Sequence, residues 1–149
     1  MNSDSILSQL PYSKPFLFVD KILEVNENSI TGEYTFSSDL DFYKGHFKNN
    51  PVTPGVILTE CMAQIGVVCL GIYLLNSEHS LQKSAEIALS SSEIEYLKPV
   101  YPGEKVTVIS EKKYFRFSKL KCNLRMMDSA GNLVCRGTIA GMLARNEQD

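Results

Sequence analysis

The stretch from Pro51 to Leu75 constrains the fold of this chain more than any other. It has the sequence PVTPGVILTECMAQIGVVCLGIYLL. The Pro54-Gly55 pair ends the preceding structure, and the apolar run behind it is too long for one strand, so we expect a helix from about Val56 to Leu75. Because apolar residues cover every face of this helix, it must be wrapped by protein or lie in a membrane.

Apart from the hydroxyl of Thr59, two polar residues interrupt the run, Glu60 and Gln64. They lie one helical turn apart and therefore share a face. Burying a carboxylate is costly unless it is paired, hydrogen-bonded or kept protonated. Either Glu60 is a functional acid, or it hydrogen-bonds Gln64 and the backbone in a polar patch of the core.

The helix is just long enough to span a bilayer. However, it contains Glu60 and Gln64, no cluster of Lys or Arg flanks it, and the rest of the chain is amphipathic. We therefore expect no membrane insertion. The first residues, MNSDSILSQL, lack the basic region and apolar core of a signal peptide, so we expect a cytoplasmic protein.

The composition points to one folded domain over residues 1–149. A hydrophobic content of 44% argues against disorder, and the net charge of -2 gives no general attraction to nucleic acid. The cysteines show no CxxC pair and no metal-ligand spacing, so we expect buried free thiols and no metal site. They are Cys61, Cys69, Cys122 and Cys135.

The rest of the chain predicts an α+β protein with about six strands. Short turns between the strands favour antiparallel pairing, and one sheet curled around the helix would bury it. Such a sheet has open edges, which favours oligomerisation. A short helix is expected over Ser5–Leu10, and strands are expected over Phe16–Val25, Ile30–Phe36, Ala85–Leu97, Lys105–Phe117, Leu120–Met127 and Leu133–Leu143.

The segment from Asp39 to Pro54 is predicted to be a loop, and it carries one of the two histidines, His46. The other, His79, lies in a polar stretch that is typical of a solvated loop. A lone histidine is often structural, but His46 lies fourteen positions before Glu60 and just before the helix. An imidazole base, a protonated carboxylic acid and the free Gly55 amide would together suit proton abstraction beside a carbonyl.

The sequence of this segment resembles a family signature. Residues 45–66, GHFKNNPVTPGVILTECMAQIG, resemble the pattern GHFPxxPVMPGVLxxEAMAQxG of the FabZ-type 3-hydroxyacyl-[acyl carrier protein] dehydratases. LPYSKPFLFVDKILE near the start of the chain and YLKPVYPGEKV near residue 100 are similar to two further segments of that family. The resemblance covers essentially the whole chain and implies the hotdog fold, an antiparallel sheet wrapped around one long central helix.

The resemblance implies site residues and an activity. The catalytic histidine and glutamate of the family fall on His46 and Glu60, and its oxyanion-holding glycine falls on Gly55. The resemblance further implies dehydration of (3R)-3-hydroxyacyl chains on an acyl carrier protein, without a cofactor, in a homodimer with shared active sites and a possible trimer of dimers. Phe47 is expected to bind the oxyanion or the substrate together with Gly55, and the residues expected to support the catalytic groups are Gln64 and Val52.

Several positions depart from the family pattern, although none removes a catalytic group. Lys48 replaces the Pro of the family pattern, Thr53 replaces its Met and Cys61 replaces its Ala. Tyr12-Ser13 and Leu97-Lys98 also differ from the pattern. The acyl length and pathway therefore stay open, a specialised lipid or polyene pathway included. A hotdog thioesterase and a non-catalytic acyl-thioester-binding domain are the alternatives, and Glu60, where isomerising relatives carry Asp, disfavours isomerisation.

A run of basic residues without any acid lies near residue 120. Such a run is often only the solvated face of a strand, but it could also dock the acidic acyl carrier protein. Its members are Lys112, Lys113, Arg116, Lys119, Lys121 and Arg125.

Overall fold

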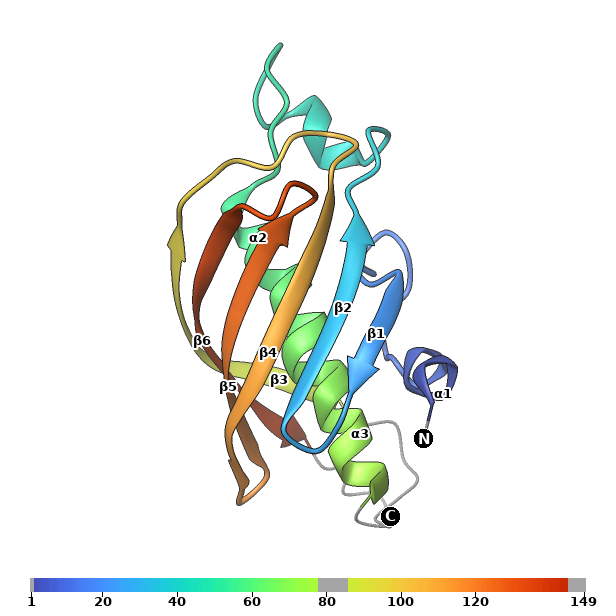
Figure 1. Ribbon diagram of the computed structural model, residues 1–149. Helices are drawn as coiled ribbons and strands as arrows, with labels where there is room; N and C mark the ends of the chain where they lie inside the picture. Colours follow the sequence, from blue (N-terminus) through green and yellow to red (C-terminus); the bar gives the residue numbers. More distant parts are fainter. Residues whose placement is uncertain (1, 78–85, 145–149) are drawn as a thin grey trace.

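A computed structural model describes residues 2–77 and 86–144 and has one curved sheet around a long helix (Figure 1). The six strands are all antiparallel in the order β1-β2-β4-β5-β6-β3, so β1 and β3 form the edges. This confirms the predicted hotdog arrangement. The strands are β1 Lys21–Val25, β2 Ser29–Thr35, β3 Glu86–Tyr96, β4 Lys105–Arg116, β5 Lys119–Asp128 and β6 Leu133–Ala144.

The central helix consists of three segments rather than one uninterrupted α-helix. These are α2 (Gly55–Ala63), a π-helical segment η2 (Gln64–Cys69) and α3 (Leu70–Ser77). Within η2 the Gly66 carbonyl accepts hydrogen bonds from Ser110 Oγ at 2.9 Å and Cys122 Sγ at 3.6 Å. A Cβ on Gly66 would lie 2.3 Å from Leu124 Cδ2 and 2.9 Å from Ser110 Cβ, so a larger residue here would require the neighbouring strands to shift.

The first strand is shorter than the sequence predicts. It begins at Lys21, and although the Asp20 amide still donates to the Glu33 carbonyl of β2 at 2.9 Å, the backbone at Phe16 and Phe18 is bonded to the helix. The Gln64 side chain donates to the Phe16 carbonyl at 3.0 Å and accepts from the Phe18 amide at 2.8 Å. A run of apolar residues therefore has strand composition here without strand pairing.

Two shorter elements also differ from expectation. The first helix, α1, spans Ser3–Ser8 and is capped by Asn2, whose side chain accepts from the Ser5 amide at 2.9 Å. The expected loop contains one turn of 3₁₀-helix, η1, over Asp41–Lys44. His79, expected in a solvated loop, lies outside the described residues.

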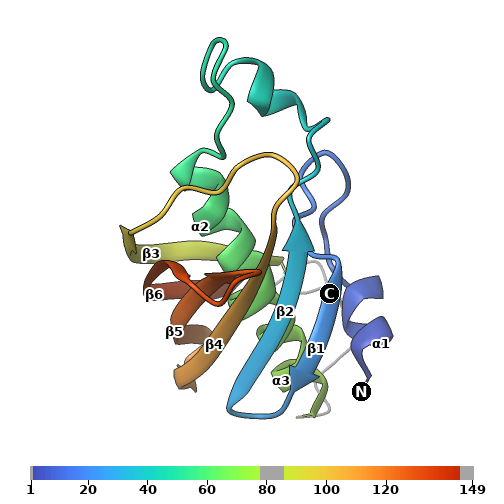
Figure 2. The same cartoon turned by 45° about the horizontal axis from the view of Figure 1, so that its top comes forward.

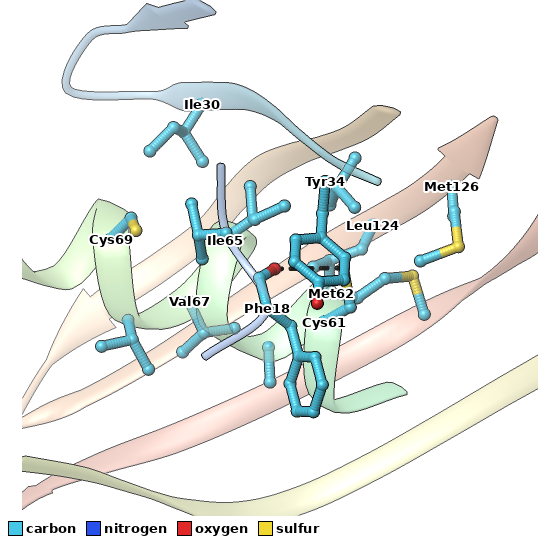
Figure 3. Packing of buried hydrophobic residues seen from close by; sticks show 14 of the residues in the cluster. Phe18, Ile30, Tyr34, Cys61, Met62, Ile65, Val67, Cys69, Leu124 and Met126 are labelled. Carbon is cyan, nitrogen blue, oxygen red and sulfur yellow. Dashed lines mark hydrogen bonds between the residues drawn. The ribbon is translucent and has the colours of Figure 1, made fainter. Parts of the chain in front are cut away.

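The core lies between the helix and the concave face of the sheet (Figure 3). All four cysteines are buried and free, as predicted, and burial raises the pKa of the Cys122 thiol to about 11. Cys61 Sγ donates to the Phe18 carbonyl at 3.4 Å.

One described helix, Gly55–Asn76, is long and apolar enough to cross a membrane, but 72% of its most apolar window is buried inside this fold.

Candidate active site

The segment between β2 and α2 extends beyond the end of the sheet and returns to the start of the helix (Figures 1 and 2). Backbone hydrogen bonds hold it in a narrow loop. The His46 amide donates to the Phe42 carbonyl at 3.0 Å, and the Val52 amide donates to the His46 carbonyl at 2.9 Å. At the tip, Phe47 and Asn50 exchange backbone hydrogen bonds of 2.8 and 2.9 Å. His46 is thus fixed on both sides although it lies outside the sheet.

The imidazole of His46 is oriented by one backbone carbonyl. Its Nδ1 lies 2.9 Å from the carbonyl oxygen of Val52, and because a carbonyl can only accept, Nδ1 carries the proton. In the neutral ring this leaves the lone pair of Nε2 free to accept a proton. The ring also stacks on Phe47 with centroids 3.9 Å apart, and Phe47 itself is 55% exposed.

Glu60 is held by Gln64 from the next turn of the helix. Gln64 is fully buried, and its amide nitrogen donates both to Glu60 Oε2 at 3.0 Å and to the Phe16 carbonyl. With its oxygen accepting from Phe18, the amide group is fully engaged. One oxygen of Glu60, Oε2, is therefore occupied, and Oε1 is left to hold or release a proton.

Burial raises the pKa of Glu60, and the hydrogen bond from Gln64 offsets part of that rise. The charge of Glu60 in turn adds to burial in raising the pKa of the nearby Tyr12 hydroxyl to about 12. A carboxyl group with a raised pKa retains its proton at higher pH and is suited to act as a general acid.

The amino end of α2 supplies hydrogen-bond donors. Its N-cap is Pro54, which provides no side-chain cap, and within the described residues neither the Gly55 nor the Val56 amide donates to another group. A cavity of about 320 Å³ opens beside Gly55, with Val52, Thr53 and Tyr96 in its wall. Free amides and the positive end of the helix dipole at this cavity could bind a developing oxyanion.

Tyr96 covers the amino end of the helix, a feature that the sequence did not reveal. A Cβ on Gly55 would lie 3.2 Å from the Tyr96 ring, and the Tyr96 hydroxyl shares a hydrogen bond with Thr59 Oγ1. The loop contains a second such pair, Tyr43 with Thr53, which is also absent from our expectations. Periodicity along the sequence does not identify Tyr96 as a partner of Thr59, because the two residues are 37 positions apart.

The single chain brings only some of the predicted groups into contact. His46 is joined to Val52 and Phe47, and Glu60 is joined to Gln64. No hydrogen bond or ion pair joins His46 to Glu60 within the described part of one chain. His46 with Val52 and Phe47, and Glu60 with Gln64, therefore form two separate groups within one chain, which we call the two half-sites.

The basic residues do not share one face of the sheet. Lys112 pairs with the inward-facing Cys122, whereas Arg116 pairs with Lys119 and Tyr114 pairs with Lys121 on the outer face. The hairpin that carries them lies at the far end of β4 from Lys105, which pairs with Thr35 just before the His46 loop. At about 3.3 Å per residue the two ends of β4 are about 35 Å apart.

Metal ligands are not grouped in the described part of the chain. Among residues 2–77 and 86–144, no three His, Cys, Asp or Glu side chains lie together in a way that could hold a metal ion.

Comparisons with known proteins place these features in a family. The model of the FabA-like domain matches residues 10–138. The chain is 30% identical to "3-hydroxyacyl-[acyl-carrier-protein] dehydratase FabZ" of Ehrlichia chaffeensis, covering 98% of this chain and 97% of that one. It is 34% identical to the protein of the same name from Caldicellulosiruptor bescii, covering 93% and 95%.

Solved structures show the same fold at low sequence identity. The dehydratase heterocomplex ApeI:P of Xenorhabdus doucetiae matches with a TM-score of 0.79 at 12% identity, covering 95% of this chain and 91% of that one. A hypothetical thioesterase of Streptococcus pneumoniae, solved with coenzyme A, matches with a TM-score of 0.60 at 16% identity, covering 83% and 84%. Dehydratases and thioesterases thus share this fold, which alone does not identify the reaction.

Proposed function

Because this chain belongs to the FabZ-type dehydratases of the FabA-like domain family, we propose that it removes water from (3R)-3-hydroxyacyl chains. The chains would be carried as thioesters on an acyl carrier protein, the substrate class that the names of the relatives print. The product is the trans-2-enoyl thioester, in fatty acid or related acyl-chain biosynthesis. One observation carries the proposal: within the described residues, neither Nε2 of His46 nor Oε1 of Glu60 has a hydrogen-bond partner, so each remains available for proton transfer.

In the proposed reaction, His46 Nε2 removes a proton from C2 of the substrate. The negative charge that develops on the thioester oxygen is stabilised by the Gly55 amide and the helix dipole. Protonated Glu60 donates its proton to the C3 hydroxyl, the C3–O bond breaks, and water leaves as the C2–C3 double bond forms. Proton transfer from imidazolium to carboxylate through solvent restores both groups, so no external reductant or cofactor is consumed.

The proposed site is shared between two copies of the chain, His46 from one and Glu60 from the other. The lack of any hydrogen bond or ion pair between the two half-sites in the described part of one chain supports this arrangement. So does the exposure of apolar residues near them, since Phe47 is 55% and Val56 74% exposed. In addition, β3 is an edge strand of 11 residues that ends at Tyr96 beside the helix start, and on the side away from β6 it pairs with no strand of the described residues. We propose a cytoplasmic homodimer as the smallest active unit.

The activity is tested by incubating the protein with a 3-hydroxyacyl thioester of acyl carrier protein and following the mass of the carrier. Loss of one water without release of the carrier thiol supports dehydration, whereas appearance of the free thiol would identify a thioesterase. His46→Ala and Glu60→Gln should each lower the rate by about 10²–10⁴-fold. An unchanged substrate with wild-type protein would refute the proposed function and leave the binding domain as the alternative.

The shared site is tested by mixing the two inactive variants. In a hybrid dimer of His46→Ala and Glu60→Gln, one site contains both substitutions and the other contains neither. Refolding an equal mixture should therefore recover about one quarter of wild-type activity. If both residues of a site come from the same chain, the mixture stays inactive.

A further inference from the structure

A buried pair of hydroxyl groups closes the base of the His46 loop. Tyr43 and Thr53 are 6% and 4% exposed, and their side-chain oxygens lie 2.5 Å apart. No buried side-chain nitrogen or oxygen in the described residues lacks a partner, and at this position each hydroxyl satisfies the other. Losing either one would leave a buried polar group unpaired, which is costly. This pair is therefore a specific feature of the loop and not a surface contact.

The pair connects the His46 loop to a fixed part of the molecule. Tyr43 lies in the 3₁₀ turn η1, three residues before His46. The Thr53 amide donates to the Val100 carbonyl at 2.9 Å, and Val100 is fully buried in the connection between β3 and β4. Through Thr53, the turn that leads into His46 is thus anchored to the sheet.

Thr53 is adjacent to the group that orients the imidazole. The Val52 carbonyl accepts from His46 Nδ1, so any shift of Thr53 along the chain is passed to this hydrogen bond. Thr53 also lines the cavity beside Gly55, where the proposed oxyanion would lie. The position of Thr53 therefore sets the imidazole relative to the amino end of the helix, and a displacement of about 1 Å at such a site can cost about a hundredfold in rate.

Given the dehydratase function proposed above, we infer that Tyr43 and Thr53 are positioning residues that hold the imidazole of His46 in its reactive tautomer and place. Neither hydroxyl contacts the reacting atoms. Burial raises the pKa of the Tyr43 hydroxyl, so the phenol stays protonated and the pair does not itself titrate at neutral pH. The pair acts through the Val52 carbonyl and through the turn that leads into His46.

The kinetic test compares Tyr43→Phe, Thr53→Val, the double variant and Thr53→Ser. Each single substitution should lower kcat about tenfold or more while KM changes less than about twofold. The double variant should be no worse than either single variant, because both remove the same bond. Thr53→Ser keeps the hydroxyl and should recover most of kcat. Additive losses, or losses confined to KM, would overturn the inference.

Ser110→Ala is the matched control for a loss of stability. It also removes a buried hydroxyl, one that donates to the Gly66 carbonyl at 2.9 Å in the middle of the helix. It should lower Tm by a similar amount to Thr53→Val but leave kcat unchanged in the folded protein. If Thr53→Val and Tyr43→Phe lower only Tm, the pair is merely structural and the inference fails.

A readout independent of turnover is the tautomer of His46, measured by ¹⁵N NMR of labelled histidine. The sequence has only two histidines, so a His79→Gln variant assigns the His46 signals. Wild-type His46 should be protonated on Nδ1, and this signal should weaken in Thr53→Val and Tyr43→Phe but persist in Thr53→Ser. If the two variants change the tautomer but the wild type does not dehydrate the substrate, the proposed function fails while the positioning role stands. An unchanged tautomer in both variants would refute that role.

Discussion

The two proposed catalytic residues are held by different parts of the fold. Glu60 lies on the central helix, and its partner Gln64 is fully buried and bonded to Phe16 and Phe18 of the N-terminal segment. His46 lies on a loop that extends beyond the sheet and is held by short-range backbone hydrogen bonds and by the Val52 carbonyl. The acid is thus fixed by long-range packing, whereas the base is fixed mostly by its own loop.

This difference predicts how each half-site is coupled to the stability of the protein. Changes around Glu60 disturb contacts that also anchor the N-terminal segment to the helix, so they affect folding and catalysis together. Changes in the exposed part of the His46 loop break contacts that the rest of the core does not use. The loop side can therefore lose activity without losing structure.

The largest effect is expected from Gln64→Leu. The substitution leaves the Phe16 carbonyl and the Phe18 amide without their present partners, each at a cost of about 1–3 kcal/mol, so the free energy of unfolding should fall by about 2–6 kcal/mol. Phe47→Ala, on the loop side, should lower the dehydration rate but change the stability by less than about 0.5 kcal/mol. Urea denaturation measures both. Equal destabilisation by the two variants would contradict the contrast between the half-sites.

The sequence predicts the acid side better than the base side for a physical reason. The unbroken apolar run and the one-turn spacing of Glu60 and Gln64 are local patterns, and helical geometry converts them directly into a shared face. The family signature identified His46, but the contact of its ring with the Val52 carbonyl depends on the three-dimensional course of the loop. Local composition does not encode that course.

Partners far apart in the sequence were missed for the same reason. Gln64 forms hydrogen bonds with the backbone of Phe16 and Phe18, so the start of the predicted strand is bonded to the helix and does not pair as a strand. The pairing of Tyr96 with Thr59 across 37 positions was also invisible, as was the π-helical segment where Gly66 approaches the sheet. Periodicity shows which face a residue occupies, but not which group it will meet there.

The next effect is a pH dependence that belongs to the acid side alone. Because burial raises the pKa of Glu60 above its ordinary value of 4.5, the folded state binds the proton more tightly than the unfolded state. The proton on Glu60 therefore stabilises the fold fully below the unfolded pKa, and this contribution is lost as pH rises through the folded pKa. The Glu60→Gln variant cannot ionise at this position, so it should not lose this stability as pH rises.

This dependence is measured as Tm against pH for wild type and Glu60→Gln between about pH 4 and 8. The Tm of the variant should rise relative to wild type as pH increases above the unfolded pKa, and the difference should be constant below it. Gln64→Leu cannot serve as a control because it changes the same carboxyl group. A difference that is flat across the whole range, or that falls with pH, would show that Glu60 is not held in a proton-retaining environment.

The smallest effect is expected far from both half-sites, on the outer face of the β4–β5 hairpin. If Lys119 and Lys121 help to dock an acidic acyl carrier protein, Lys119→Glu with Lys121→Glu should raise KM for carrier-linked substrate by about two- to threefold at low salt. The effect should vanish at high salt, and kcat should stay unchanged. The exposed Lys21→Glu on β1 is the control for a change of charge alone.

A short thioester analogue that lacks the carrier distinguishes docking from a general electrostatic effect. Its KM should be the same in wild type and in the double variant, because it makes no contact with the hairpin. The hairpin lies about 35 Å along β4 from Lys105, which pairs with Thr35 just before the His46 loop, so a carrier docked there would have to span that distance to reach the site on its own chain. An equal rise in KM for both substrates would exclude the hairpin as the docking surface and leave its lysines as the solvated face of a strand.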